Sequence, residues 1–303
     1  MPVEVKKVRC NVRQFRDRTF ELWRCVGCQS LHCEKVDDLA SYYANYPIRE
    51  QTLDAFVRSW YRVILRRLLA AGLRKDHRVL DYGCNQGLFL QFMAEQGYAR
   101  CVGYDPYVEA YRAAQVLEQR YDFVVSLDVI EHDADPRAFL QKLVALLAPG
   151  GALCVETPNA EGILLKESEE YLHAIHAPYH EHILSQRGLE QLIAEQGLVN
   201  VAFYDRWYMD SWLPGAARKL FERLMLLAGN DLDSGYEKPR FDLFWRHPSL
   251  IFYLFFGYFL PSQKRDHMMV IARPRTASST AAVATTTRRM RPSNGSDSAL
   301  HRA

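Results

Sequence analysis

From His77 onward the chain alternates short apolar runs with amphipathic stretches, and this alternation constrains the fold more than any other feature. The clearest apolar run is YDFVVSL, residues 121–127. Apolar strands separated by helices are typical of a parallel sheet that helices cover on both faces. We therefore expect an α/β fold with a doubly wound, mostly parallel sheet.

The expected elements follow each other in a regular order. The expected strands are residues 78–82, 99–104, 121–127, 152–156, 199–207 and 267–272. The expected helices are residues 49–71, 88–96, 136–147 and 188–196, with a short helical stretch at 108–118. Pro149-Gly150-Gly151 is expected to end the 136–147 helix, because neither residue type continues a helix well.

A glycine-rich turn, DYGCNQG at residues 81–87, joins the first of these strands to the next helix. Gly83 and Gly87 allow the backbone of such a turn to bend tightly and to approach a ligand. Ligands of open α/β sheets bind at the carboxyl ends of the strands, where the helix N-terminus also offers free N–H groups. Asp81 can meet an ammonium group of that ligand. Such a turn is by itself a weak signal.

A carboxylate at the end of the second expected strand adds a second element. Asp105 lies 18 residues after Gly87. At this position it can accept hydrogen bonds from both hydroxyls of a ribose, as in NAD-binding folds. Taken alone, Asp105 could equally cap the turn before Pro106. Together, the glycine-rich turn and Asp105 at this spacing indicate a ligand that contains a nucleoside.

The run from residue 79 to 159 resembles the class I, Rossmann-like methyltransferases that use S-adenosylmethionine. The motifs that carry the resemblance are VLDYGCNQG, VGYDP, YDFVVSLDVIEH, the dipeptide Asp135-Pro136, LLAPGGALCVETPN and HAPYHEHILSQRGLEQLIAEQGL. The family's sheet has seven strands, of which the last is antiparallel and inserted; here that strand would be residues 267–272. The resemblance implies a methyltransferase domain over residues 47–274, with S-adenosylmethionine as its cofactor.

The resemblance also implies which residues bind the cofactor. Asp81, Gly83 and Gly87 would surround its methionine part, and Asp105 would hold its ribose. The other expected contacts are Cys84, Asn85 and Pro106, together with three residues that would line the pocket below the sulfonium: Ser126, Leu127 and Asp128.

Two departures from the family fall on this site. Asn85 stands where the family usually has glycine, and Asn tolerates left-handed backbone better than other residues do. Only 15 residues separate Pro106 from Asp122, so the third strand, which carries the polar residue that contacts adenine, is shortened or missing. Val116 and Leu117 are the expected apolar neighbours of adenine.

Residues 1–46 are expected to form a small β-rich knuckle that resembles the zinc ribbon preceding many of these enzymes. The ribbon has two Cys-x-x-Cys pairs, and Cys25-Val26-Gly27-Cys28 is one of them. Cys10 begins the other, but Arg13 takes its second position. Since zinc prefers four N or S ligands, Cys33 or His32 could complete a site with Cys10, Cys25 and Cys28. The alternative is a ribbon that has lost its metal.

A dense group of histidines follows the 152–156 strand, in the loop that overhangs the cofactor's methyl group in this family. The group comprises His173, His176, His180 and His182. A hydroxyl acceptor needs a base, and histidine is the usual one. We expect His176 and His180 to be catalytic, although any one of the four could be a surface or capping residue. His132 is expected to shape the cofactor pocket, and a metal held by these His and Glu residues is a further alternative.

Residues 208–262 interrupt the alternation with many aromatic residues and leucines, ending in SLIFYLFFGYFL. This insertion could touch a membrane surface, cover a lipid-like substrate, pack between subunits, or form an ordinary buried lid. The chain lacks the roughly 20 consecutive apolar residues of a membrane span. Its N-terminus lacks the apolar core of a signal peptide, so we expect a cytoplasmic protein, which the insertion could attach to a membrane surface.

The formal net charge is +2, and residues 273–303 contribute +5, which leaves −3 on the rest. This balance argues against nucleic acid as a partner. Residues 275–303 are expected to form a disordered basic tail. Three functions remain: a methyltransferase acting on a small-molecule, sugar or lipid-linked acceptor, an NAD-dependent oxidoreductase, or a non-catalytic relative. The second would need G-x-G-x-x-G, whereas positions 85 and 88 are Asn and Leu. The sequence does not determine the oligomeric state.

Overall fold

A computed structural model describes residues 2–44, 46–47, 51–208, 210–211, 217–235, 237, 240–260 and 265–275. The expected basic tail lies, from residue 276 onward, outside the described residues. None of the helices that the structure describes is long and apolar enough to cross a membrane.

The centre of the protein is a six-stranded sheet in the order β5-β4-β6-β7-β10-β9. Its strands are β4 (Val79–Tyr82), β5 (Cys101–Tyr104), β6 (Tyr121–Leu127), β7 (Leu147–Pro158), β9 (Leu198–Arg206) and β10 (His267–Pro274). β4, β5, β6 and β7 are parallel, whereas β10 runs antiparallel to both of its neighbours. The α/β prediction and the inserted, antiparallel last strand are therefore confirmed.

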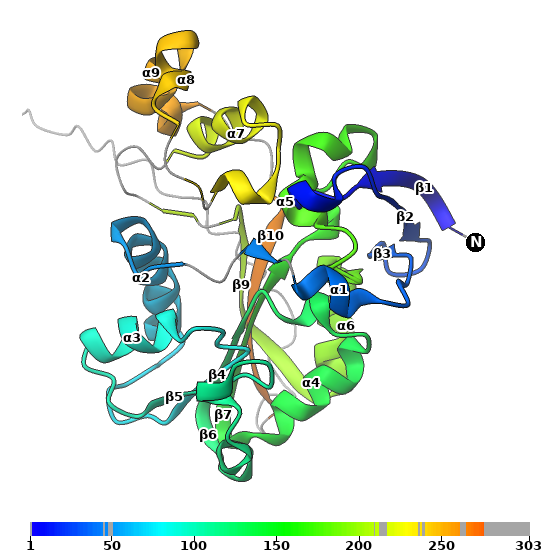
Figure 1. The fold of residues 1–303 in the computed structure, drawn as a ribbon. Helices are drawn as coiled ribbons and strands as arrows, with labels where there is room; N and C mark the ends of the chain where they lie inside the picture. The colour runs from blue at the N-terminus through cyan, green and yellow to red at the C-terminus, as the bar shows by residue number, and fades with distance from the viewer. Residues whose placement is uncertain are drawn as a thin grey trace, which may run out of the picture.

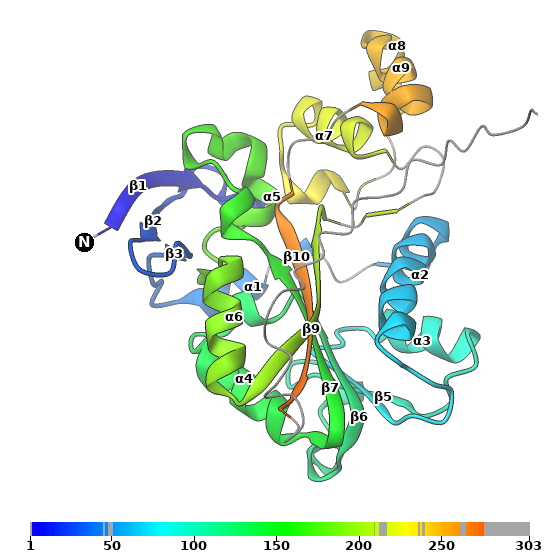
Figure 2. The same ribbon diagram turned by 180° about the vertical axis from the view of Figure 1, so that it is seen from behind.

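Helices cover the sheet on both faces, as Figures 1 and 2 show. On one face, α2 (Ala55–Ala70) and α3 (Leu88–Glu95) form a core with alternate strand residues such as Val79 and Phe123. On the other, α4 (Pro136–Ala145) and α6 (Gln186–Glu195) pack against Leu80 and Val124. Successive strand residues point to opposite faces, so these nearly continuous apolar strands fill both cores.

Side-chain caps define where the helices begin. Asp54 accepts the N–H of Val57 at the start of α2, and Asp135 caps α4, whose first residue is proline. The helix expected from residue 49 thus begins at residue 55. The predicted role of Pro149-Gly150-Gly151 was wrong: α4 ends at Ala145, and the three residues form the irregular start of β7, where its register with β6 shifts.

The third strand of the family is missing here. Residues 105–120, all of which the structure describes, contain two short 3₁₀ turns, η3 (Glu109–Tyr111) and η4 (Ala114–Glu118), instead of the single helical stretch that we expected. β5 is therefore an edge strand of the sheet. Any adenine pocket at this edge is built from turns.

The N-terminal knuckle is part of a second sheet that it shares with the α/β domain. Its strands β1 (Pro2–Arg9), β2 (Thr19–Cys25) and β3 (Leu31–Cys33) pair with each other, and β3 also pairs with β8 (His182–Ile183). Further short elements are η1 (Arg13–Phe15), α1 (Leu39–Ala44), η5 (Ile130–His132), η6 (Ala160–Gly162), η7 (Leu165–Tyr171) and α5 (Leu172–Ile175). Knuckle residues and the segment after β7 form one core. The knuckle is thus not a separate body.

The aromatic-rich insertion forms short helices above one end of the sheet (Figure 2). They are α7 (Arg218–Leu227), η8 (Leu232–Gly235), α8 (Asp242–Arg246), α9 (Ser249–Phe256) and η9 (Gly257–Phe259). Their buried centre is small, with Ala217, Leu220, Leu243 and Leu250. Most of the large apolar side chains of α8, α9 and η9 therefore remain exposed.

Candidate functional site

The glycine-rich turn follows β4 and begins α3, as the sequence predicts. Three of its residues have positive φ angles: Gly83 at 83°, Asn85 at 47° and Gly87 at 75°. A Cβ atom on Gly83 would overlap with the side chain of Val129, and one on Gly87 would overlap with the phenol of Tyr111. Both positions thus require glycine, while Asn85 adopts the left-handed conformation without distorting the turn.

Asp105 closes β5 and contacts this turn. Its Oδ2 atom accepts the backbone N–H of Asn85 at 3.0 Å, and its Oδ1 atom accepts that of Tyr107 at 2.9 Å. Each carboxylate oxygen has a second lone pair. Asp105 can therefore still accept two hydroxyl groups of a ribose, while Pro106 lies exposed beside it.

Asp81 is buried at the end of β4, with 3% of its surface exposed. Burial, and to a smaller extent the charge of Asp105, raises the pKa of its carboxyl to about 7. An ionised carboxylate in such a place gains stability from a nearby cation. Cys84 is buried close by, and burial raises the pKa of its thiol well above the usual value.

The three residues expected below the sulfonium lie at the carboxyl end of β6, next to β4. Ser126 is completely buried, and its Oγ atom has no hydrogen-bond partner among the described residues. Leu127 packs against the core formed with α2 and α3. Asp128 has a φ of 53°, its Oδ1 atom also lacks a hydrogen bond, and burial raises its pKa. Buried polar atoms need partners, so these atoms fit a polar ligand or water.

A buried ion network that the sequence did not indicate lies beside Asp128. Arg206, at the end of β9, is completely buried. It pairs with Glu156 of β7 and, at 2.6 Å, with Asp210, which also accepts a hydrogen bond from Arg67 at 2.6 Å. The network neutralises acidic groups under the site. In the sequence, only Glu156 near the end of β7 and Arg206 at the end of β9 could indicate this network, and charged residues at strand ends are usually exposed.

The four histidines of residues 173–182 lie in different environments. His173 Nε2 lies 2.9 Å from Asp266 Oδ2, to which Arg218 donates at 2.7 Å. His182 lies in β8, opposite His32 of the knuckle. His176 and His180 both lie near His132, and His180 also lies near Glu131.

His176 is buried, and residues of the N-terminal segment engage both of its ring nitrogens. Its Nδ1 atom lies 2.6 Å from Asn11 Oδ1, and its Nε2 atom 2.7 Å from Tyr46 Oη. Since an amide oxygen only accepts, Nδ1 carries the hydrogen and Nε2 accepts from the tyrosine. Burial lowers the pKa of His176 well below its usual value. To act as a base, His176 would have to lose the Tyr46 hydrogen bond.

His180 has one ring nitrogen free to accept a proton. Its Nδ1 atom lies 2.8 Å from the carbonyl oxygen of Ala174 and must therefore carry the hydrogen. The unprotonated Nε2 atom of His180 lies 3.9 Å from the Oε1 atom of Glu131. Burial lowers the pKa of His180 well below its usual value and raises that of Glu131 to about 8. Thr157 holds Glu131 by donating to its Oε2 atom at 2.9 Å.

His132 completes this buried group. Its Nδ1 atom lies 3.0 Å from the carbonyl oxygen of Tyr179 and 2.9 Å from Tyr43 Oη. Glu131, His132 and His180 each offer a ligand atom, and these atoms lie within 4.8 Å of one another. The arrangement can therefore serve either proton transfer or a divalent cation.

The structure brings together only two of the three expected zinc ligands. Cys25 and Cys28 lie side by side, but Cys10 is completely buried in the knuckle core, where burial raises its pKa to about 11. Cys33 is buried in the same core. The residue that joins Cys25 and Cys28 is His32.

The comparisons with known proteins identify the kind of domain in which this candidate site lies. A family profile described as "Methyltransferase domain" matches residues 53–202, which include the turn, Asp105 and the end of β6. This chain carries an S-adenosylmethionine-dependent methyltransferase domain. The match agrees with the strand order and favours a methyltransferase over an NAD-dependent oxidoreductase. The N-terminal zinc-ribbon branch receives no support from it, because the matched range begins after the knuckle.

The methyltransferase domain is similar to curated enzymes named "Ubiquinone biosynthesis O-methyltransferase". The protein from Nitrobacter winogradskyi is 27% identical over 172 residues, which cover 50% of this chain and 60% of that protein. The one from Bradyrhizobium diazoefficiens is 28% identical over 195 residues, covering 52% and 74%. The chain thus spans less than two thirds of the length of the first of these relatives.

Solved structures of other methyltransferases are also similar. One is the 1,6-didemethyltoxoflavin-N1-methyltransferase of Burkholderia thailandensis, at 15% identity and a TM-score of 0.43, covering 84% of this chain and 99% of that one. Another is N-methyltransferase NodS of Bradyrhizobium japonicum, at 15% identity and a TM-score of 0.39, covering 74% and 89%.

Proposed function

We propose that the protein transfers the methyl group of S-adenosylmethionine to a hydroxyl oxygen of a small-molecule or lipid-linked acceptor, with His180 as the general base. The observation that carries the proposal is the free Nε2 atom of His180, which faces Glu131 next to the carboxyl end of β6. The O-methyltransferase relatives favour oxygen as the methylated atom.

The cofactor-binding residues act mainly by positioning. Asp81 would pair with the ligand's ammonium, Asp105 would hold the ribose, and Ser126 and Asp128 would offer polar atoms below the sulfonium. The bound cofactor supplies an electrophilic methyl carbon, and holding reactants in line can contribute several kcal/mol to the rate. Glycines in the turn let the backbone approach the ligand closely.

The base acts on the acceptor. His180 Nε2 would take the hydroxyl proton as the oxygen attacks, and the ring would then carry a positive charge beside Glu131. Burial disfavours a charged imidazole. With a pKa of about 8, Glu131 is ionised in part of the molecules near neutral pH, and its carboxylate then offsets this cost by pairing with the charged ring. His180 and Glu131 thus act together as one proton-accepting unit.

The test is methyl transfer to matched acceptors. Purified protein is incubated with S-adenosylmethionine labelled in its methyl group and with aromatic hydroxyl compounds or their amine analogues, each with and without an alkyl tail. We expect label in the hydroxyl series and a lower KM for the tailed members. Label only in the amines would contradict oxygen as the acceptor atom. The absence of turnover with intact cofactor binding would favour a non-catalytic protein.

A divalent cation is the second candidate for the centre at His180, because Glu131, His132 and His180 could all be ligands. A cation there would bind the acceptor oxygen directly and lower the pKa of its hydroxyl. The two mechanisms differ in their response to a chelator. If His180 is the base, activity withstands dialysis against EDTA and addition of Mg²⁺ leaves it unchanged. Activity that disappears with EDTA and returns with Mg²⁺ would instead support the metal.

We also propose that the insertion contacts a membrane, where a lipid-linked acceptor would be met. The structure leaves Trp245 84%, Phe259 82% and Phe241 70% exposed. We call these residues, with the exposed Phe252, Phe255 and Phe256 of α9, the aromatic surface. So many exposed aromatic side chains are unusual for a soluble monomer and suit the headgroup region of a bilayer.

Cosedimentation with phosphatidylcholine–phosphatidylglycerol vesicles tests this contact. We expect the wild-type protein to pellet with vesicles, and the variant with Trp245→Ser and Phe255→Ser to stay in the supernatant. Tyr107→Ser is the matched control, because Tyr107 is 95% exposed but lies outside the insertion. If the wild-type protein does not pellet with vesicles, and analytical ultracentrifugation without vesicles shows a dimer, the aromatic surface would instead be a subunit interface.

A further inference from the structure

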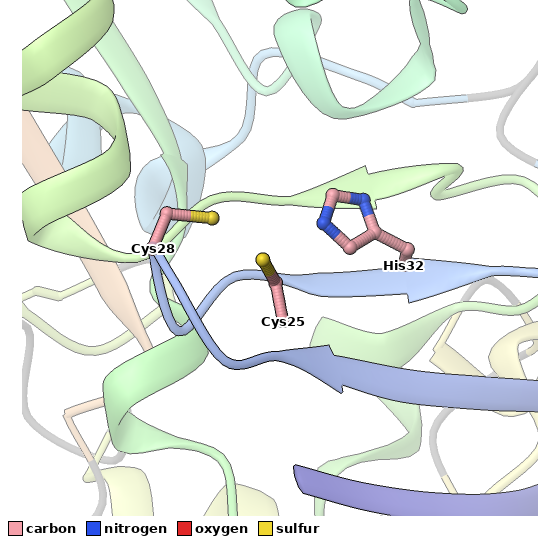
Figure 3. Close-up of side chains that lie close together, drawn as sticks. All are labelled: Cys25, Cys28 and His32. Carbon is pink, nitrogen blue, oxygen red and sulfur yellow. The ribbon is translucent and has the colours of Figure 1, made fainter. Parts of the chain in front are cut away.

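The turn after β2 gathers three side chains that the methyltransferase site does not use. Figure 3 shows the sulfur atoms of Cys25 and Cys28 and one ring nitrogen of His32 directed towards the same small space. One ligand atom of each residue lies within 4.8 Å of the others. All three side chains are only half-buried, so an ion can reach them from solvent. Thiolate and imidazole are the preferred ligands of zinc.

The backbone holds the two cysteines in place. The N–H of Cys25 donates to the carbonyl oxygen of Ser30 at 2.8 Å, and the N–H of Gln29 donates to that of Cys25 at 3.0 Å. These bonds close the turn around Cys25-Val26-Gly27-Cys28. The turn thus keeps the two sulfur atoms on the same side of the loop, where one ion can contact both.

A chain of hydrogen bonds from the methyltransferase domain fixes the orientation of His32. His182 Nε2 lies 3.2 Å from the carbonyl oxygen of Ala134 and therefore carries its hydrogen. Its Nδ1 atom must then accept the hydrogen of His32 Nδ1, which lies 2.9 Å away. This leaves the lone pair of His32 on Nε2, the nitrogen directed at the cysteines. Histidine ligands of metals are commonly oriented by such a second hydrogen bond.

We propose that Cys25, Cys28 and the Nε2 atom of His32 bind one zinc ion, with a water molecule in the fourth position and His182 as the orienting partner. The zinc-ribbon pattern assigned Cys10 to this site, whereas the structure supplies His32. No redox step is involved: each thiol that binds gives up its proton to solvent as its zinc–sulfur bond forms.

The site lies close to the catalytic segment along the chain. His182 follows His180 by two residues. Between them, the N–H of Glu181 donates to the carbonyl oxygen of Glu131 at 2.9 Å, and the carbonyl oxygen of Glu181 accepts the N–H of Cys33 at 3.0 Å. Zinc at Cys25, Cys28 and His32 would therefore stiffen the contact between the knuckle and the segment that carries His180.

The experiment measures metal in the full-length protein without any methyl acceptor, so its result does not depend on the proposed function. The wild-type protein and variants are purified under reducing conditions, loaded with zinc, passed through a desalting column and measured by inductively coupled plasma mass spectrometry. A parallel set is loaded with Co²⁺, whose thiolate bands in the near ultraviolet report sulfur ligands. Circular dichroism checks that each variant is folded.

We expect one zinc per wild-type chain, and loss of zinc and of the cobalt–thiolate bands in Cys28→Ser and His32→Gln. Cys10→Ala and Cys101→Ala are the matched cysteine controls and should keep both. His182→Gln should bind zinc about 10–100-fold more weakly, because it removes only the orienting bond. A wild-type protein that holds no zinc after loading would overturn the proposal. So would loss of zinc from Cys10→Ala while His32→Gln keeps it.

Discussion

The buried carboxyl of Asp81 makes cofactor binding depend on pH. Its pKa of about 7 means that the free protein carries this group partly protonated near neutral pH. The ligand's ammonium group would bind the ionised form, so binding must expel the proton. The pKa of the Asp81 carboxyl is raised in the free protein and would be lowered in the complex with S-adenosylmethionine. The affinity for S-adenosylmethionine should therefore decrease as the pH falls below 7.

The magnitude follows from the fraction of Asp81 that is ionised. With a pKa of about 7, this fraction is roughly three quarters at pH 7.5 and about 3% at pH 5.5. The Kd for S-adenosylmethionine should therefore rise about 25-fold between these pH values. At pH 6, binding should release about 0.9 protons per ligand. The upper limit of pH 7.5 avoids titration of the ligand's own amino group, whose pKa is about 8.

Isothermal titration calorimetry measures both quantities, with two buffers of different ionisation enthalpy giving the proton count. In Asp81→Asn, the affinity should be weaker and nearly independent of pH. Glu131→Gln is the control, because it removes a second buried acid that titrates near neutral pH but should leave the slope unchanged. A wild-type Kd that changes less than about 3-fold over this range would refute the reasoning, as would an unchanged slope in Asp81→Asn.

Three further variants test the remaining parts of the site. Arg206→Met leaves the buried carboxylate of Glu156 without its paired cation, while Asp210 keeps Arg67. We therefore expect the free energy of unfolding to fall by about 3–5 kcal/mol in urea titrations; a loss below about 1 kcal/mol would contradict the ion network. Gly83→Val should eliminate S-adenosylmethionine binding in calorimetry while the far-ultraviolet circular dichroism stays the same, since the side chain would enter the turn; retained affinity would place the cofactor elsewhere. His180→Gln should lower kcat about 100-fold or more with little change in cofactor Kd, whereas His176→Gln should have a smaller effect on kcat; the reverse order would make His176 the base.

The sequence predicted the sheet well because its strands are apolar on both faces and are separated by capped helices. The strands of the central sheet were placed to within about two residues at each end, except that β7 begins at Leu147, five residues before its expected start. The errors fall where local signals conflict. Pro149-Gly150-Gly151 contains helix-ending residues, yet the helix ends earlier and β6 pairs with the chain on both sides of this segment.

The candidate cofactor-binding residues come together for a related reason. They lie on three short segments, the turn after β4, the end of β5 and the end of β6, and the sheet places these segments side by side. The Arg206 network was not predictable, because Glu156, Asp210 and Arg67 come from β7, a segment after β9 and α2. Only the folded sheet shows that these charges meet inside the protein.

The histidines of residues 173–182 show how the N-terminal segment contributes to the candidate site. The family resemblance placed all four near the methyl group, but their partners decide what each can do, and three of those partners, Asn11, Tyr46 and His32, come from the N-terminal segment. Tyr46 forms a hydrogen bond with Nε2 of His176, and His32 forms one with Nδ1 of His182. The ring of His180, in contrast, donates from Nδ1 to Ala174 of its own segment, and its Nε2 atom stays free to accept a proton. The N-terminal segment thus leaves His180 as the residue best able to accept a proton.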